Sequence, residues 1–259
     1  MSVTVVIPFF NAERYIYQAI NSVFEQTFQE WKLILINDAS TDDSLSMIQP
    51  FLKDSRVTLL QHNENKGQSV ALNSGLSNVM TPFLIQLDAD DYYFPDTLHA
   101  LVTEAKSVSE DVAVIGGNVQ IAWEKKNRIR RKKVIKGRPF HDVKDFLSAN
   151  MSVWPRFYRT SALHHIGGWP TDDPWSGRHA EDIRVITRLL EKKYAVHWIN
   201  KTLLFNRRHS KNDSNNSNRY GDVFEWIVID ALNRLEDPMK PIFKTYHNGW
   251  KQLIRFEEE

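Results

Sequence analysis

Three acidic side chains stand together in Asp88-Ala89-Asp90-Asp91, directly after the apolar run Phe83–Leu87. Carboxylates this close repel one another unless a cation neutralises them. Hard divalent ions such as Mg²⁺ and Mn²⁺ prefer oxygen ligands and often bridge to substrate phosphates. The alternative is a solvated acidic turn before Pro95. Because the acids end an expected strand, we favour a metal site.

A further carboxylate, Asp38, follows the apolar run Trp31–Asn37. An acid just past a strand can accept hydrogen bonds from a ribose or from base N–H groups. Helix capping is the alternative, because Asp and Ser suit helix starts. Ser40, Thr41 and Asp42 are available for capping, which favours a ligand-binding role for Asp38.

The adjacent acids Glu181 and Asp182 open an expected helix over Ala180–Lys192, after a stretch rich in Gly and Trp at 166–177. Acids in the first turn stabilise a helix start, and taken alone this is the better explanation. A positioned carboxylate can also deprotonate an acceptor hydroxyl as general base.

A basic segment, Arg207-Arg208-His209-Ser210-Lys211, enters a polar loop. His209 can ligate a metal, and Arg208 or Lys211 can bind phosphate. A solvated basic loop explains the same residues equally well.

The elements that must position these groups follow from hydrophobic periodicity. We expect strands at Val3–Ile7, Trp31–Asn37, Val57–Gln61, Phe83–Leu87 and Val112–Ile121, and helices over Ala12–Gln26, Gln68–Ser77 and Pro95–Lys106. Alternating strands and helices predict an α/β fold with a mostly parallel central sheet flanked by helices. Ligands bind at the carboxyl ends of such strands, where Asp38 and Asp88 stand.

The second half loses this alternation. It holds two short expected strands, Val196–Ile199 and Thr202–Asn206, and expected helices over Tyr220–Leu235 and Ile242–Phe256. We expect a catalytic domain over 1–218, with a nucleotide-binding half over about 1–121 and an acceptor half over about 122–218. Residues 219–259 would be a helical extension packed on or beside it.

Composition limits the function classes. The chain has 259 residues, of which 42% are hydrophobic and 25% charged, no cysteine, and a formal net charge of +1. A disulfide framework, a thiolate zinc site and a cysteine nucleophile are excluded. No apolar run reaches bilayer-spanning length. We expect a cytoplasmic protein, with peripheral contact at the inner face of the membrane left open.

Two surface features stand apart from the expected site. The basic run Lys125–Lys136 is too charged for burial, so we expect it to be mobile or to face an anionic acceptor, such as a phosphate-bearing glycopolymer or a lipid head group. Nucleic-acid binding ranks low, because charge runs are usually solvated. The tail Met239–Phe256 carries a helical apolar stripe, favouring docking on its own domain over a homodimer or a membrane-surface contact.

Taken together, the motifs resemble glycosyltransferase family 2, a large group of inverting enzymes with the GT-A fold. The resemblance runs from about Val3 to about Ser214 and rests on motifs in order: Val5–Asn11 with Tyr15-Ile16, Ser22–Phe28, Asp38 with Ser40 and Asp43-Ser44, Asn65-Lys66-Gly67, Ala71–Gly75, Leu87–Asp91 with Pro95, Ile166–Trp169, Glu181-Asp182 and Arg208-His209. Each motif is weak singly, and their joint occurrence is specific.

The resemblance implies roles for these residues. Donor binding would involve Pro8, Phe9, Asn11, Asp38, Lys66, Gly67, Asp88, Ala89, Arg208 and Lys211. Asp90 would be the main metal ligand, with His209 near the metal or diphosphate. Asp182, rather than Glu181, would be the base, because the second acid of the family's Glu-Asp pair usually has this role. Trp154, Trp169 and Trp175 are the candidates for the acceptor side.

The implied function is a metal-dependent transfer of a single sugar, with inversion, from a nucleotide-diphosphate sugar to a hydroxyl of a glycan, glycopolymer or lipid-linked acceptor. The cofactor would be Mn²⁺ or Mg²⁺, and UDP is the donor nucleotide commonest in the family. Cell-wall or surface polysaccharide synthesis is the expected setting. The alternatives are a catalytically inactive binding module, disfavoured by the intact acids, and a nucleotidyltransferase, disfavoured because Pro8–Asn11 lacks a glycine-rich loop.

Overall fold

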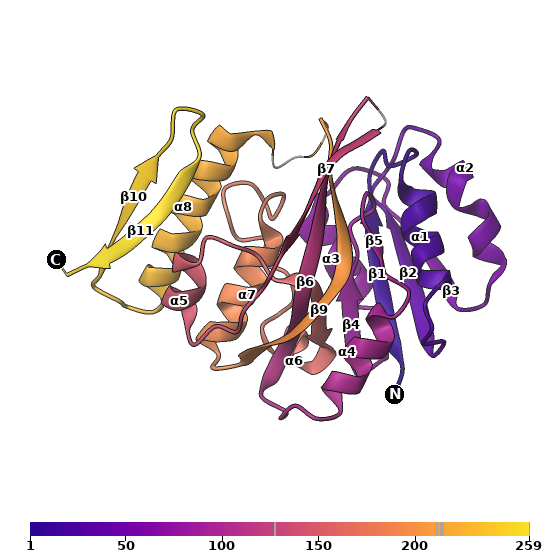
Figure 1. Cartoon of the computed structure of the whole chain (residues 1–259), viewed down its shortest axis with the longest axis horizontal. Helices are drawn as coiled ribbons and strands as arrows, with labels where there is room; N and C mark the ends of the chain where they lie inside the picture. The colour runs from indigo at the N-terminus through magenta and orange to yellow at the C-terminus, as the bar shows by residue number, and fades with distance from the viewer. Residues whose placement is uncertain (127, 211, 213–214, 259) are drawn as a thin grey trace.

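The computed structural model describes residues 1–126, 128–210, 212 and 215–258 (Figure 1). Within them a nine-stranded sheet runs in the order β3 (Val57–Gln61), β2 (Trp31–Asn37), β1 (Val3–Phe9), β4 (Phe83–Gln86), β8 (Trp154–Arg159), β6 (Val112–Lys125), β9 (Ala195–Arg208) and β5 (Tyr92–Tyr93), with β7 (Arg128–Ile135) paired to β6. The expected α/β class is confirmed.

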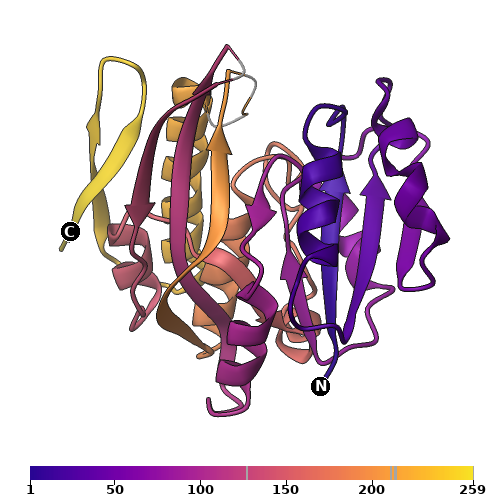
Figure 2. The ribbon, with the colours of Figure 1, turned by 45° about the vertical axis from the view of Figure 1, so that its right-hand side comes forward.

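Helices cover both faces of this sheet (Figures 1 and 2). They are α1 (Ile16–Phe24), α2 (Ser44–Ile48), α3 (Gln68–Leu76), α4 (Thr97–Ala105), α5 (Val143–Ser148), α6 (Thr160–His165), α7 (Glu181–Glu191) and α8 (Ser217–Arg234), with a short 3-10 helix at Gln49–Lys53. Side chains of a strand alternate between faces. Val5 and Leu33 accordingly pack in the core beneath α1 and α4, whereas Val6 and Ile34 pack in the core beneath α3 and α7.

The sheet is parallel only in its first half. Strands β3, β2, β1 and β4 are parallel neighbours, as expected. Beyond them β8 is antiparallel to both β4 and β6, β7 is antiparallel to β6, and β6 and β9 are parallel. The expectation of a mostly parallel sheet therefore holds for β3, β2, β1 and β4 and is wrong beyond β4, where β6 is followed by its antiparallel neighbour β7 without a crossover helix.

Strand β9 is continuous where two short strands were expected. Its pairing with β6 shifts register between Gly116 and Asn118, which face Trp198 and Thr202. Over this stretch β6 advances by two residues while β9 advances by four. The additional residues of β9 form a bulge, which accommodates the polar residues that interrupt the apolar pattern of this strand.

The C-terminal tail is a β-hairpin, so the helix expected over Ile242–Phe256 is wrong. Strand β10 (Lys240–Thr245) pairs antiparallel with β11 (Lys251–Glu257). Gly249 has a φ of +81° in the connecting turn, and its N–H donates to the Tyr246 carbonyl at 2.8 Å. Asn-Gly between two apolar runs favours a hairpin, because both residues tolerate positive φ. The spacing of the apolar residues by itself fits a helix, but the Asn-Gly turn between the two runs favours a hairpin.

The hairpin docks on α8, the helix that precedes it in the chain. A Cβ atom on Gly221 would overlap the Gly249 carbonyl oxygen, so the two backbones approach as closely as a glycine permits. The Lys251 ammonium lies 2.7 Å from Asp222 and 2.6 Å from Glu225 of α8. Leu253, buried in the shared core, completes the contact.

Gly221→Ala should therefore destabilise the protein although alanine favours helices. The gain in helix propensity of about 1 kcal/mol should be outweighed by overpacking against a backbone carbonyl, leaving a net loss of about 1–2 kcal/mol in the free energy of unfolding. Urea denaturation measures it, with the exposed α8 change Asn233→Ala as control. A Gly221→Ala protein that is more stable than the control would contradict the docked hairpin.

Candidate active site

A cleft of about 1200 Å³ opens at the carboxyl ends of the parallel strands. It is larger than the roughly 300–1,000 Å³ typical of a single small-ligand site. Its walls come from the ends of β1, β4 and β9, the loop before α3, the start of α7, and α8 with the C-terminal hairpin. It therefore has room for two ligands side by side.

On the β1 side, the residues expected to bind a nucleotide line the cleft, namely Pro8, Phe9, Asn11, Asp38, Gly67, Asp88 and Ala89. Buried Asp38 accepts hydrogen bonds from His62 Nδ1 at 2.7 Å, from Lys66 N at 2.9 Å and from Gly67 N at 2.8 Å. It thereby fixes the loop that enters α3. The Lys66 side chain is exposed and does not line the cleft, so only its backbone contributes here.

Arg156 of β8 is a buried cation that sequence reasoning missed. Its guanidinium lies 2.8 Å from Asp88, 3.3 Å from Asp182 and 3.6 Å from Glu181. One positive charge thus faces three carboxylates from two separate parts of the chain. The sequence feature that could have revealed it is an arginine inside the aromatic strand Trp154–Arg159. A charged side chain at such a position is buried only when it is paired.

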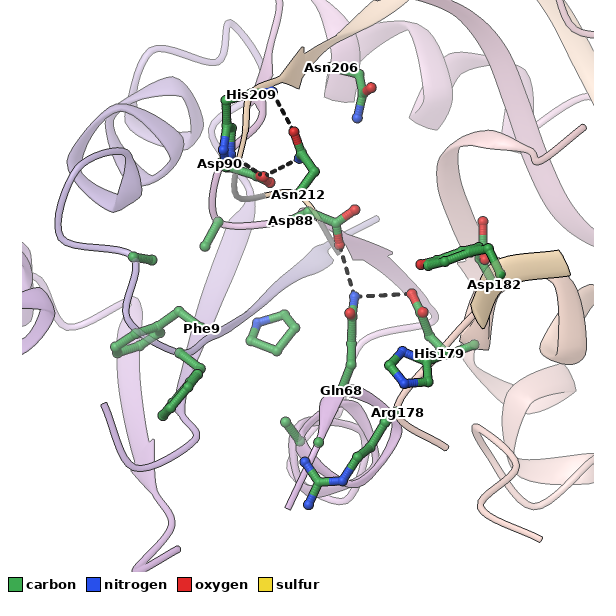
Figure 3. Close-up of a pocket in the computed structure, with 18 of the residues that line it drawn as sticks. Phe9, Gln68, Asp88, Asp90, Arg178, His179, Asp182, Asn206, His209 and Asn212 are labelled. Carbon is green, nitrogen blue, oxygen red and sulfur yellow. Dashed lines mark hydrogen bonds and ion pairs between the residues drawn. The ribbon is translucent and has the colours of Figure 1, made fainter. Parts of the chain in front are cut away.

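Two glutamine amides complete this network. Gln68 Nε2 donates to Asp88 at 3.1 Å and to Glu181 at 3.0 Å (Figure 3). Gln86 Nε2 donates to the same two carboxylates at 3.1 and 3.0 Å. Burial, reinforced by the negative charge of Asp182, raises the pKa of Glu181 to about 7. Asp182 is less enclosed and accepts from the Ser152 hydroxyl. The two adjacent acids therefore occupy different environments.

Asp90 and His209 meet on the other side of the cleft (Figure 3). His209 Nε2 and Asn212 Nδ2 lie 3.0 and 2.9 Å from the same Asp90 oxygen. Among the described residues, no three acidic or histidine side chains converge as a complete metal cage. A carboxylate oxygen and an imidazole nitrogen still suit a divalent ion whose other ligands are water and substrate oxygens.

Asp91 faces the interior rather than the cleft, unlike the other two acids of the turn. Its carboxylate accepts from Arg207 N at 2.8 Å and from Asn206 Nδ2 at 2.7 Å. Burial raises its pKa well above the ordinary value, and the charges of Asp90 and Asp88 raise it further. Asp91 therefore anchors the turn to β9, which corrects the view of three equivalent clustered acids.

Of the three tryptophans expected on the acceptor side, only Trp154 lines the cleft. Trp169 is buried and packs edge-on against Tyr158 at 5.6 Å, and Trp175 packs against Trp226 at 6.2 Å.

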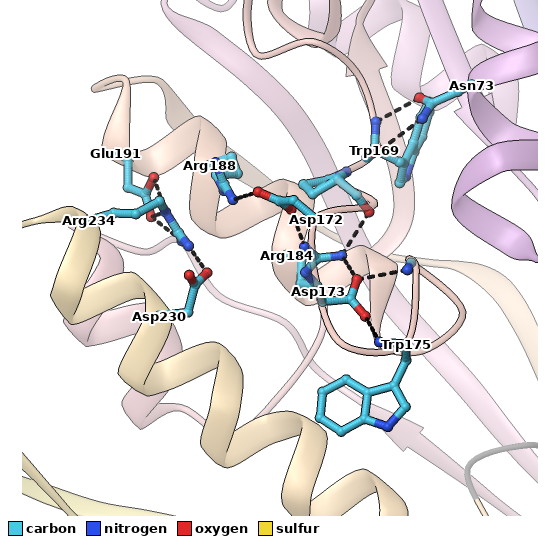
Figure 4. Close-up of polar contacts among 12 residues, drawn as sticks. Asn73, Trp169, Asp172, Asp173, Trp175, Arg184, Arg188, Glu191, Asp230 and Arg234 are labelled. Atoms are coloured by element: carbon cyan, nitrogen blue, oxygen red, sulfur yellow. Dashed lines mark hydrogen bonds and ion pairs between the residues drawn. The ribbon is translucent and has the colours of Figure 1, made fainter.

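The loop that carries Trp169 and Trp175 is held away from the cleft by polar contacts (Figure 4). Arg184 binds Asp172 and Asp173, while the Asn73 amide donates to the Trp169 carbonyl at 2.8 Å. Trp250 lines the cleft instead, with its ring stacked on Phe224 at 6.4 Å.

Several basic side chains lie around the cleft. Arg208 lines the cleft, whereas Lys211 lies outside the described residues. Arg178 and His179, which the sequence did not single out, also line it. Arg178 donates to the Asn65 side chain at 2.6 Å and to its carbonyl at 2.9 Å, which ties the loop before α7 to the loop before α3.

The family model for glycosyl transferase family 2 matches residues 4–167. An uncharacterized glycosyltransferase of Haemophilus influenzae is 32% identical over 124 residues, which cover 48% of this chain and 38% of that protein. The putative teichuronic acid biosynthesis glycosyltransferase TuaG of Bacillus subtilis is 34% identical over 97 residues, covering 37% of this chain and 38% of TuaG. The matches thus span about two fifths of these relatives.

Two solved structures share the fold. TarS 1-349 of S. aureus, in complex with UDP-GlcNAc, superposes with a TM-score of 0.68 at 18% identity, covering 90% of this chain and 67% of that one. The mannosyltransferase PcManGT from Pyrobaculum calidifontis, in complex with GDP-Man and Mn²⁺, has a TM-score of 0.67 at 17% identity, covering 89% and 64%. The expected GT-A type fold is confirmed.

The raised pKa of Glu181 predicts a pH dependence of stability. Relative to the ordinary value of 4.5, a folded-state pKa of about 7 adds stability that is complete below pH 4.5 and is lost as the pH rises through 7. The wild type should therefore become less stable as the pH rises from 5 to 8. The Glu181→Gln side chain cannot ionise, so the decrease in its free energy of unfolding over the same range should be about 2 kcal/mol smaller.

Urea denaturation at both pH values tests this prediction. The exposed change Glu110→Gln is the control and should follow the wild-type pH dependence. If Glu181→Gln and the wild type lost equal stability, Glu181 would not be a protonated buried acid at neutral pH.

Proposed function

The chain belongs to glycosyl transferase family 2, and on that premise we propose that it transfers one sugar, with inversion, from a nucleotide-diphosphate sugar to an acceptor hydroxyl. The observation that carries the proposal is that two separate groups of polar side chains line one cleft. Asp90 and His209 form a metal-compatible pair on one side, and Asp182 stands apart from them with Arg156 and Ser152. A cleft of about 1200 Å³ accommodates donor and acceptor together.

The nucleotide would lie on the β1 side, between Phe9 and the loop fixed by Asp38. Asp38 keeps one carboxylate oxygen with a single hydrogen bond, so that oxygen can accept another from a base or ribose. Lys66 and Lys211 remain candidates through their places in the motifs. We propose a UDP-sugar as donor, supported by the UDP-GlcNAc held by the structurally similar TarS.

A divalent ion, Mn²⁺ or Mg²⁺, would be held by Asp90 and His209 together with donor oxygens. It would supply positive charge that stabilises the departing diphosphate. Arg208 at the cleft wall suits the same phosphates. PcManGT, which shares the fold, was solved with Mn²⁺, and this supports the assignment.

Asp182 would take the proton from the attacking hydroxyl. Its carboxylate lines the cleft, and its contacts with Ser152 and Arg156 orient it. Attack from the face opposite the diphosphate inverts the anomeric centre without a covalent enzyme intermediate. Glu181 is hydrogen-bonded to Gln68 and Gln86 and suits a positioning role.

The acceptor would lie against the wall built by the start of β8 with the residues before it, by α8 and by the C-terminal hairpin. Met151, Trp154, Phe224 and Trp250 give this wall an aromatic and apolar character suited to the C–H face of a sugar ring. Similarity to the teichuronic acid glycosyltransferase TuaG supports a cell-wall or surface glycan acceptor. An inactive binding module would not require this complete set of acids.

Asp90→Ala should abolish metal-dependent nucleotide binding. Removing the carboxylate leaves His209 as the remaining protein ligand of the pair, so Mn²⁺ should no longer tighten UDP binding. Isothermal calorimetry with UDP, with and without Mn²⁺, measures this effect. Asp96→Ala, an exposed acid outside the cleft, is the control. Equal metal dependence in Asp90→Ala and wild type would refute the metal assignment.

Asp182→Asn should reduce transfer by roughly 10²-fold or more while donor affinity stays nearly unchanged. The amide keeps the shape and removes the basicity. Glu181→Gln should be milder, because Glu181 does not contact the acceptor in this proposal. UDP release from UDP-GlcNAc with a cell-wall glycan acceptor gives the rate, and calorimetry gives the donor affinity. Near-normal turnover of Asp182→Asn beside an inactive Glu181→Gln would reverse the roles.

A further inference from the structure

Strands β6 and β7 form a hairpin whose tip rises above the carboxyl edge of the sheet (Figures 1 and 2). We refer to residues 123–136 as the basic hairpin. Eight of the twelve residues 125–136 are Lys or Arg and none is acidic, although the whole chain has a formal charge of only +1. The rest of the protein is therefore net negative, and positive charge is concentrated in one exposed element.

The cations of the basic hairpin contact no acidic side chain among the residues that the structure describes. Within the described residues, no salt bridge involves a Lys or Arg of the basic hairpin. Glu124, its one acid, is already paired with Arg14 and with Arg207 at 2.8 Å, both from outside the hairpin. The cations instead contact rings, with Arg131 over Trp123 at 5.1 Å and Lys132 over Phe205 at 5.5 Å. The element thus keeps its positive charge unneutralised at the surface.

Apolar side chains are exposed among these cations. Trp123, Ile129 and Val134 are 37%, 44% and 43% exposed. Charges alone protect a free strand edge from pairing with another chain, so edge protection does not account for the three apolar residues. A double-stranded nucleic acid presents its phosphates outward and has no apolar layer that could take up such side chains. A bilayer surface offers both anionic head groups and an apolar boundary layer, which matches both kinds of side chain.

We propose that the basic hairpin docks on an anionic membrane surface, with its cations among the head groups and with Trp123 and Ile129, which lie close to its turn on opposite faces, at the acyl boundary. Among the described residues no helix is long and apolar enough to cross a membrane, and docking of this kind needs none. Glu124, two residues before the turn of the hairpin, contacts Arg14, which lines the cleft. The docked hairpin therefore holds the cleft beside the bilayer. This inference does not depend on the proposed function.

Vesicle co-sedimentation tests the proposal with the full chain. The wild type should bind vesicles of 30% phosphatidylglycerol in phosphatidylcholine and should not bind pure phosphatidylcholine. Replacing Arg130, Arg131, Lys132 and Lys133 by Ser should weaken binding at least about tenfold, because each cation near an anionic surface contributes to it. Replacing Trp123 and Ile129 by Ser, with all cations retained, should also weaken binding severalfold.

The matched control replaces four exposed lysines elsewhere, Lys53, Lys106, Lys192 and Lys240, by Ser, which changes the net charge equally. It should bind like the wild type, and thermal unfolding confirms that each variant is folded. Binding that is unaffected by the Trp123 and Ile129 changes, or a stronger affinity for a 20-base-pair DNA than for the vesicles, would overturn the membrane assignment. So would an equal loss in the control.

Discussion

The guanidinium of Arg156 holds the site together. It lies inside the protein between Asp88, which ends the parallel half of the sheet, and the two acids that open α7. Removing one partner of a buried ion pair typically costs about 3–5 kcal/mol, because the remaining charges are left uncompensated. Here three carboxylates converge on one cation, and Gln68 and Gln86 supply the further hydrogen bonds. The excess of negative charge is relieved by Glu181, whose pKa is raised to about 7.

A second buried arginine has the corresponding role on the side of Asp90. Arg207 of β9 donates to the Asp90 carbonyl at 3.0 Å, to Gln18 at 2.6 Å and to Glu124 at 2.8 Å. Its backbone N–H holds Asp91 inward, so that Asp90 is left facing the cleft. The two arginines come from strands of the second half of the sheet and bind acids at the ends of the first half. They fix the relative positions of the two sides of the cleft.

The C-terminal segment completes the cleft from beyond the region that the family model matches. That match ends at residue 167, so α7, α8 and the hairpin are all outside it. The close approach of Gly221 and Gly249 brings Trp250 to the cleft wall beside Phe224. This wall of the cleft is therefore built by residues outside the family match.

Local sequence patterns determined the strands and helices of the first half and the acids at their carboxyl ends. Periodicity and turn residues operate over short distances, so Val57–Gln61 and Asp88–Asp91 could be placed without knowing their neighbours. Side-chain direction depends on pairing between distant strands. Only the tertiary structure therefore showed that Asp91 turns inward, that Trp169 is buried and that Arg156 joins three acids. The tail stripe fitted a helix by spacing alone, and its hairpin is stabilised by docking on α8, a contact between distant residues that periodicity does not encode.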